Sequence, residues 1–334
     1  MAETTLIIDL IGIALLVLVV MAAIGIVLTR DLFAAVMLLG IFSLLMAATF
    51  FILDAADVAL TEAAVGAGVS TVLLLGTLAL TTDREKPGRR RRFLPITVVS
   101  LTTMVMLYAT FDKPPLGDPD APVHQHVAPR YLEQGPEEVG VPNLVTAVLA
   151  SYRGYDTLGE VAVVFTAAIG VLTMLGFGRR RGQFVTRISA DLIKSIKHHV
   201  VPRVVSKSLI PFILLFALYV QFHGDYSPGG GFQAGAIFAA AVMLYALIQG
   251  DDTARKALPL KAMQFFMSLG LLLYIGVGLA SMLNGGAFLD YDVLSDDPLA
   301  GQHLGIILIE LGVGMTVAAA LVAIFYSIAG REHR

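Results

Sequence analysis

Long apolar stretches recur along the chain and are separated by short polar segments. Each stretch is long enough to cross about 30 Å of hydrocarbon as a helix. Only a helix satisfies all backbone groups within one such stretch, and the sequence lacks the ten-residue alternation of a membrane β-barrel. The pattern predicts an all-α, polytopic transmembrane helix bundle of nine spans, near residues 5–28, 32–53, 58–81, 93–111, 157–177, 208–222, 232–249, 262–283 and 302–328.

The loop charges predict the orientation of these spans. If the N-terminus lies outside and the spans alternate, the inner segments hold 20 of the 23 Lys and Arg residues. The outer segments keep only Lys113, Arg130 and Arg153. Such a bias places the basic segments in the cytoplasm, so we expect the N-terminus out and the C-terminus in. The first stretch has no basic leader and no small-residue cleavage site, so we interpret it as a retained span.

Two connecting segments are long. The predicted outer loop, 112–156, is rich in Pro and acidic residues, and its residues 143–150 form an apolar segment expected to be a short helix on neighbouring spans or at the membrane interface. The inner segment, 178–207, has the spacing of a basic amphipathic helix, typical of a membrane-surface linker. The basic cluster Arg89 to Arg92 lies in a predicted inner loop, and the excess of Lys and Arg that inner loops normally carry is sufficient to explain it.

The composition is typical of a membrane protein and excludes several kinds of functional site. Apolar residues make up 57% of the 334 residues and charged residues only 15%. Cysteine is absent, which excludes disulfides, thiolate metal sites and Cys-ligated iron–sulfur clusters. The net charge of −3 gives no basic field for nucleic acid. No nucleotide-binding motif and no HExxH motif occur, so we expect no cofactor and no metal.

Three carboxylates lie inside predicted spans. Glu62 and Glu160 are each about one turn into their spans, and Glu310 is expected to be deeper, about two turns into the ninth. Carboxylates are costly in hydrocarbon and commonly mark proton or ion paths. The alternative is a structural carboxylate that is protonated or hydrogen-bonded to a neighbouring helix. No span carries a Lys at its centre, which indicates part of a pathway and not a complete pump.

Glycines provide a second set of candidates. Gly66 and Gly68 follow Glu62 by about one turn, where either close helix packing or a π-bulge can form. The predicted outer hairpin 223–232 contains Pro228, Gly229, Gly230, Gly231 and Phe232 in succession. Three consecutive glycines permit backbone conformations that other residues avoid, so we interpret the hairpin as a specific structure, with a plain tight turn as the alternative.

At this hairpin the sequence resembles a known family. Residues 206–328 resemble the MnhB/MrpB family of Mrp-type Na⁺/H⁺ antiporter subunits, through segments 211–219, 223–235 and 305–317 with the Pro-Gly-Gly-Gly-Phe motif at 228–232. Many members carry a His three residues before the Pro of this motif. Here that position is Asp225, and His223 lies two residues earlier, so either residue is a candidate for a protonatable role.

The first half of the chain resembles two further segments. Residues 5–81 are similar to the MbhD-like segment, with the stretch 57–66 as its signature, and residues 93–178 to the MbhE-like segment, with the stretch 142–160. Together they resemble the J subunit of respiratory complex I, whose third helix can carry a π-bulge. We therefore expect an MbhD-like three-helix module (1–82), an MbhE-like two-helix module (93–180), a cytoplasmic linker (181–205) and an MnhB-like four-helix domain (206–334).

The resemblance implies a function. It identifies the chain as a cell-membrane subunit of an Mrp-type complex that exchanges Na⁺ for H⁺, with large antiporter-like A and D subunits and C, E, F and G subunits as partners. It implies a role in transport and not an enzyme. It maps Glu62 and Glu160 onto acidic positions proposed for an ion path, and Asp156 joins these candidates. Two alternatives remain: an ion-translocating module of a membrane-bound hydrogenase or related redox complex, and a structural scaffold.

Overall fold

The computed structural model describes residues 2–78, 81, 84–85, 93–115, 117–175 and 200–329. Within them, nine helices are long and apolar enough to cross a membrane. Each coincides with one of the predicted spans, so the predicted number of spans and the all-α, multi-pass membrane class are confirmed. The orientation of the termini remains a prediction. The Arg89 to Arg92 cluster and most of the linker 181–205 lie outside the described residues.

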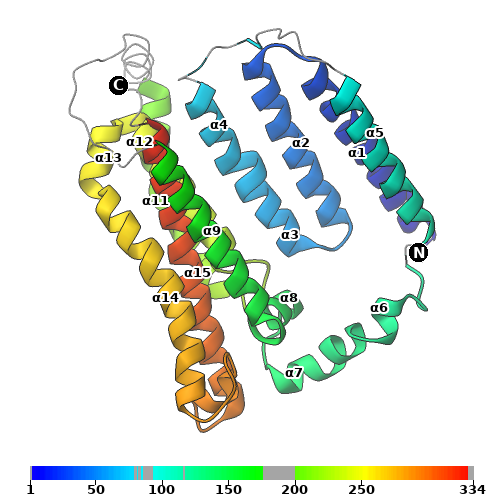
Figure 1. Cartoon of the computed structure of the whole chain (residues 1–334), viewed down its shortest axis with the longest axis vertical. Coiled ribbons are helices and arrows are strands. Elements are labelled where there is room, and N and C mark those ends of the chain that lie inside the picture. The colour runs from blue at the N-terminus through cyan, green and yellow to red at the C-terminus, as the bar shows by residue number, and fades with distance from the viewer. Residues whose placement is uncertain are drawn as a thin grey trace.

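The first three spans form a small group of helices (Figure 1). They are α1 (Ala2–Leu28), α2 (Leu32–Ile52), and a third span built from α3 (Ala56–Thr61), η1 (Glu62–Val69) and α4 (Ser70–Leu78). The segment η1 is a π-helix, so the π-bulge expected as one alternative at Gly66 and Gly68 is present. A Cβ atom built on Gly66 would lie 2.7 Å from Ser43 Oγ of α2, so the second alternative, close packing, holds as well.

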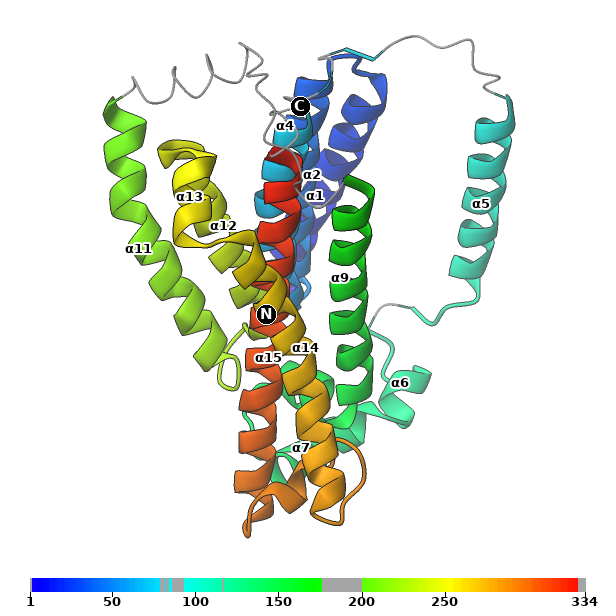
Figure 2. The ribbon, with the colours of Figure 1, turned by 60° about the vertical axis from the view of Figure 1, so that its left-hand side comes forward.

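The next module has two long helices that do not pack on each other. Figure 2 shows α5 (Phe93–Phe111) standing apart from the bundle, and none of its residues is buried. The loop after it contains α6 (Pro122–Gln125), η2 (Arg130–Gln134), α7 (Gly135–Glu138), α8 (Leu144–Thr146) and η3 (Ala147–Tyr152). The short helix expected at 143–150 is therefore present, and its Thr146, Ala147 and Ala150 are buried. It leads into the fifth span, α9 (Gly154–Leu175).

The last module carries most of the buried surface. Its helices are α11 (Val200–His223), α12 (Gly231–Gln249), α13 (Asp251–Ala257), α14 (Leu260–Leu283), the 3₁₀ turn η4 (Tyr291–Leu294) and α15 (Pro298–Ala329). Because α11 begins at Val200, the boundary predicted at residue 206 falls inside this helix. The membrane-crossing part of α11, Arg203–His223, begins five residues before the apolar run predicted at 208–222.

Glycines allow the central helices to approach closely. A Cβ atom on Gly235 of α12 would lie 2.8 Å from the carbonyl oxygen of Gly314 on α15. A Cβ atom on Gly312 of α15 would lie 2.7 Å from the carbonyl oxygen of Gly270 on α14. Both crossings leave room only for hydrogen, which is how small residues drive helix association in lipid. The resulting core includes Val69 of η1 and Leu172 of α9, so all three modules contribute to it.

Candidate functional site

The hairpin between α11 and α12 is irregular backbone held by hydrogen bonds on every side. The Gly230 N–H donates to the carbonyl oxygen of Val220 at 3.1 Å, and Gly230 has φ of +124°. A Cβ atom on Gly224 would lie 2.9 Å from the nitrogen of Gly230, because the two arms of the turn touch. Irregular backbone at membrane depth needs protein around it, and here the surrounding modules provide it.

Glu310 of α15 binds the first residue of α12. Its Oε2 accepts a hydrogen bond from the Gly231 N–H, which is one of the backbone donors that a helix leaves unsatisfied at its N-terminus. A Cβ atom on Gly230 would lie 2.9 Å from the same oxygen. The carboxylate therefore lies against the glycine backbone, and a negative charge is favourable at this end of the helix. Glu310 and the hairpin glycines, both predicted from the sequence, form one site.

Asp57 of α3 binds the same hairpin from the first module. Its Oδ1 accepts the Gly229 N–H at 3.0 Å, and the side chain is only 8% exposed. The neighbouring Thr61 accepts a hydrogen bond from Gln233 Nε2 at 2.8 Å, so a second polar contact joins α3 to α12. Two carboxylates from distant parts of the chain thus bind alternate N–H groups of one glycine run.

Asn143 connects the remaining module to the hairpin. Its side-chain amide donates to the carbonyl oxygens of Gly224 and Ser227, both at 3.0 Å, and lies 3.5 Å from Asp57 Oδ1. Its side-chain oxygen accepts the Val145 N–H at 2.9 Å and so caps α8. One buried amide therefore joins α3, α8 and the hairpin.

The two protonatable hairpin candidates have different surroundings. Asp225 is 9% exposed, and its Oδ2 lies 3.1 Å from Nδ1 of His303 on α15. Burial raises the pKa of the Asp225 carboxyl above its ordinary range, and the adjacent His303 opposes this rise. His223 instead stacks on the rings of Tyr219 and Tyr226, with centroid distances of 4.8 and 5.7 Å. The geometry favours Asp225 over His223 as the protonatable group that contacts α15.

Other predicted hairpin residues frame this site without contacting the carboxylates. Pro228 is exposed and lies three residues before α12 begins. Phe232, in the first turn of α12, packs on the apolar cluster that contains Ile306 and Ile309 of α15. These two residues shape the turn, whereas the three glycines contact the acids.

The remaining carboxylates lie apart from the hairpin. Glu62 begins the π-helix, and its side chain lies with Ser43 over Gly66, because a Cβ atom on Gly66 would be 2.5 Å from Glu62 Oε1. Glu160 on α9 is exposed on the surface of the chain. Asp156, in the first turn of α9, is also exposed and accepts a hydrogen bond from Arg153 Nε at 2.6 Å.

The expected depth of Glu310 is wrong. The sequence pattern placed this residue deeper than Glu62, because it lies further into its own span. However, α15 has 32 residues and is about 48 Å long, whereas the hydrocarbon layer is about 30 Å thick. Its first turns project past the hairpin end of the bundle, the end that carries residues 224–230 (Figure 2). Glu310 therefore lies level with the first residue of α12, and Glu62, five residues beyond the hairpin-bound Asp57, lies deeper.

Sequence reasoning did not select Asp57, Asn143 and His303 as site residues. A weak signal existed for Asn143, since an Asn directly before an apolar helix is a common N-cap. Asp57 and His303 lie near the ends of apolar runs, where polar residues are ordinary. Their partners are far along the chain, so periodicity could not reveal them.

Three family models match successive parts of the chain. Residues 201–323 match the model described as a domain related to the MnhB subunit of Na⁺/H⁺ antiporter. Residues 17–83 match MbhD and residues 88–187 match MbhE, which are described as the D and E subunits of MBH.

Relatives match nearly the whole chain or a part of it. The chain is 26% identical over 330 residues to a protein of Rhizobium meliloti that is named as the A/B subunit of a K⁺/H⁺ antiporter; the match covers 90% of this chain and 32% of that protein. It is 33% identical over 137 residues to the antiporter subunit mnhB2 of Staphylococcus aureus, covering 40% of this chain and 96% of the relative. The chain thus spans about a third of the length of the first relative.

Solved structures are also similar. A chain of the Mrp complex from Dietzia sp. matches with a TM-score of 0.74 and 27% identity, covering 95% of this chain and 34% of that one. A chain of an archaeal membrane-bound sulfane sulfur reductase, a respiratory membrane complex, matches with a TM-score of 0.54 and 30% identity, covering 71% of this chain and 97% of that one.

The described residues contain nine helices that can cross a membrane, and the matches to antiporter subunits place the chain in the class of multi-pass cation/proton antiporter subunits. More particularly, the chain belongs to the MnhB family of antiporter subunits, here joined to MbhD and MbhE segments as in subunits of Mrp type. The family predicted from the sequence is confirmed.

Proposed function

We propose that this chain is a transport subunit of an Mrp-type complex that exchanges a monovalent cation for H⁺, and that the hairpin cluster belongs to its proton path. The single observation that carries this proposal is the pair of carboxylates on one glycine run: Asp57 on the Gly229 N–H and Glu310 on the Gly231 N–H. The role is transport, and it requires no chemical catalysis.

The hydrogen bonds connect proton binding to hairpin geometry. An ionised Glu310 is a strong acceptor for the Gly231 N–H and interacts favourably with the positive end of α12. A proton on Glu310 weakens both interactions, because the neutral acid is a weaker acceptor and has no charge. Proton uptake therefore loosens α12 from α15 at this end, and proton release tightens it. Asp57 connects the same hairpin to the first module, which contains Glu62.

Glu62, Glu160 and Asp156 have separate proposed roles. Glu62 lies in a π-helix, a feature frequent at functional sites, so we assign it to the ion path inside the first module. Glu160 is exposed on a membrane-crossing helix, where a carboxylate facing lipid would be costly. We therefore assign Glu160 to a contact with a neighbouring subunit, with the nearby Asp156 at the rim of that contact. His223 stacks on tyrosine rings and is assigned a supporting role in the hairpin.

Other Mrp-type subunits are the proposed partners, namely the large A and D subunits and the C, E, F and G subunits. The helix α5 supports this proposal, since a single helix with no buried residue gains little from its own chain. The transported cation is Na⁺ or K⁺, because the relatives are named for one or the other.

The test is cation-dependent proton flux in inverted membrane vesicles, normalised to the amount of assembled complex. A Gln at position 310 keeps the size of the side chain but cannot release a proton. We expect Glu310→Gln to lower the exchange rate by about 100-fold or more, the loss that removing a proton-transfer group typically causes. Glu62→Gln and Glu160→Gln should lower it while the complex still assembles.

The matched control is Glu137→Gln, the same change at an exposed loop position outside the spans. It should exchange ions at the parental rate. If all three intramembrane variants also do so across pH 7 to 9, the carboxylates are structural and the chain is a scaffold.

A redox-driven complex is the second candidate function. It is favoured by the match to the sulfane sulfur reductase and by the MBH names of two matched models. The same ion module would then be driven by electron transfer in partner subunits. Mass spectrometry of the purified complex distinguishes the two candidates: iron–sulfur or hydrogenase-type subunits support the redox complex, and only Mrp-type subunits support the antiporter.

A further inference from the structure

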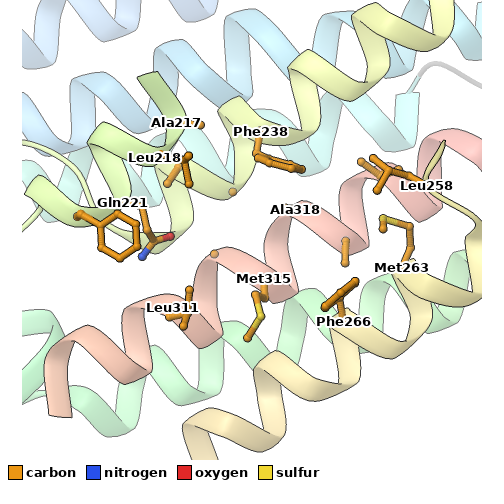
Figure 3. Close-up of a pocket in the computed structure, with 16 residues that line it drawn as sticks. Ala217, Leu218, Gln221, Phe238, Leu258, Met263, Phe266, Leu311, Met315 and Ala318 are labelled. Atoms are coloured by element: carbon orange, nitrogen blue, oxygen red, sulfur yellow. The ribbon is translucent and has the colours of Figure 1, made fainter. Parts of the chain in front are cut away.

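A groove runs between α11, α12, α14 and α15 on a face that the transport proposal does not use. Figure 3 shows Gln221 at one end of the groove and Leu258 and Met263 at the other. Its volume is about 270 Å³, and fifteen of its sixteen lining residues are apolar. It begins near the hairpin end of α11 and reaches the turn between α13 and α14, so its long direction follows the helices.

The groove has a small-residue floor between bulky walls. Ala217, Gly235, Gly314 and Ala318 contribute little side-chain volume, whereas Phe238 and Phe266 project at its sides (Figure 3). A groove of this size that faces a bilayer is filled, because an empty space would leave the lining atoms without contact partners.

Two exposed cations are close in sequence to Leu258 and Met263, which line one end of the groove. Lys256 is two residues before Leu258 and Lys261 is two residues before Met263, and both side chains are exposed. Neither lysine forms an ion pair with any residue in the described part of the chain. The neighbouring Arg255 differs, because it is paired with Asp251 at 2.5 Å. The long lysine side chains can reach an anion at the membrane surface while their stems stay against apolar groups.

A narrow apolar groove between helices favours an acyl chain over a helix. An α-helix with its side chains is about 10 Å across. An acyl chain is a single file of methylene groups and is much thinner. Basic pockets beside membrane helices attract anionic headgroups.

We propose that this groove binds one acyl chain of an anionic phospholipid, whose phosphate lies at Lys256 and Lys261. The inference is independent of the proposed transport role, because it rests on shape and charge away from the carboxylates.

The test uses the full chain purified in mild detergent and titrated with dioleoylphosphatidylglycerol or dioleoylphosphatidylcholine. Native mass spectrometry counts bound lipids, and the thermal midpoint reports stabilisation by bound ligand. We expect one lipid site with at least tenfold preference for the glycerol headgroup. The double variant Lys256→Gln/Lys261→Gln should reduce that preference to nearly one, and Lys113→Gln, an exposed lysine on the opposite side of the predicted membrane, should not.

A second variant tests the groove itself. Ala318→Phe fills the floor and should abolish the binding of both lipids, whereas Ala109→Phe on the exposed α5 should leave it unchanged. The proposal would be overturned if both lipids bound equally and if neither the lysine variant nor Ala318→Phe changed that binding. A photo-crosslinking residue at Leu218 in intact membranes should capture phospholipid; capture of a polypeptide there would show that a partner helix occupies the groove and would also overturn it.

Discussion

The first and last helices of the chain have nearly opposite surroundings although both are strongly apolar. In its most apolar 18-residue window, α1 has a mean hydropathy of 3.1 and only 11% of its residues are buried. The corresponding window of α15 is less apolar, at 2.3, yet 61% of its residues are buried. Hydropathy thus identifies a span and does not say what the span faces.

Small residues explain the difference. The buried positions of α15 include Gly301 and Gly312, where a neighbouring backbone approaches to contact, and Gly305 and Gly314, where the side chains of Tyr291 and Gln221 do. In α1, a Cβ atom on Gly12 would meet nothing within 4 Å. Lipid and protein are equally apolar, so close approach and polar contacts decide which helices associate. The loosely packed spans present apolar faces to lipid or to further subunits.

The largest expected effect is at the closest helix crossing. A Cβ atom on Gly231 would collide with the backbone of Glu310 and lie 2.8 Å from the nitrogen of Gly314. Backbone atoms cannot rotate away, so we expect Gly231→Ala to cost about 3 kcal/mol or more and to abolish assembly. The measurement is the yield of monodisperse protein and its thermal midpoint.

The control for this change is Gly276→Ala on α14, where an added Cβ atom meets nothing within 4 Å. It should be neutral or slightly stabilising, because Ala favours helix by about 1 kcal/mol. A normal yield and midpoint for Gly231→Ala would show that the crossing can open, and the packing argument would fail.

The second prediction compares a packed span with an exposed span by making the same Met→Ala substitution in each. Met267 of α14 is fully buried, and Met104 of α5 is 67% exposed. Met267→Ala should destabilise the purified chain by about 2 kcal/mol or more, since a cavity forms in a packed core. Met104→Ala should change the midpoint little in detergent. Equal losses from the two variants would contradict the burial contrast.

The sequence predicts the positions of the spans, but it does not predict which spans are packed and which are exposed. Span positions follow from apolar length, so all nine were predictable. The isolation of α5 was not predictable, because its composition resembles that of the well-packed α12 and α15. In the site, Glu310 and the glycine run each stood out alone. Their hydrogen bonds with each other and with Asp57 and Asn143 join residues that are more than 75 positions apart in the sequence, and no local pattern encodes such contacts.

The third prediction concerns the amide that joins the modules. Asn143→Leu removes the amide donor from the carbonyl oxygens of Gly224 and Ser227; Gly224 keeps the Thr146 hydroxyl as a donor at 2.7 Å, whereas Ser227 loses its side-chain donor. We expect a loss of about 1–3 kcal/mol, the usual result of leaving buried polar groups unpaired. Asn143→Asp retains the acceptor that caps α8 but loses the donors and adds a carboxylate beside Asp57, so it should be no milder. Asn284→Leu, at the exposed end of α14, is the control. The readout is the thermal midpoint, and an unchanged midpoint for both Asn143 variants would remove the amide from the connection between modules.

The smallest expected effect is the pH dependence of the Asp225–His303 contact, which joins the hairpin to the well-packed α15. Burial raises the pKa of Asp225 above its ordinary value of 3.8, so the folded protein holds this proton more tightly than the unfolded chain. The resulting stabilisation is fully present below pH 3.8 and is lost as the pH rises through the raised pKa. Asp225→Asn has no such proton to lose, so its midpoint should fall less than the parental midpoint as the pH rises through this window. At higher pH the variant also lacks the partly exposed pair with His303, a change within about 1 kcal/mol.

Thermal unfolding measured in steps from pH 3.5 to 7 checks the predicted pH dependence of Asp225→Asn. The control is Asp252→Asn, a change at an exposed carboxylate of α13. Identical pH slopes for the parent and Asp225→Asn would mean that Asp225 is as well solvated in the fold as in the unfolded chain.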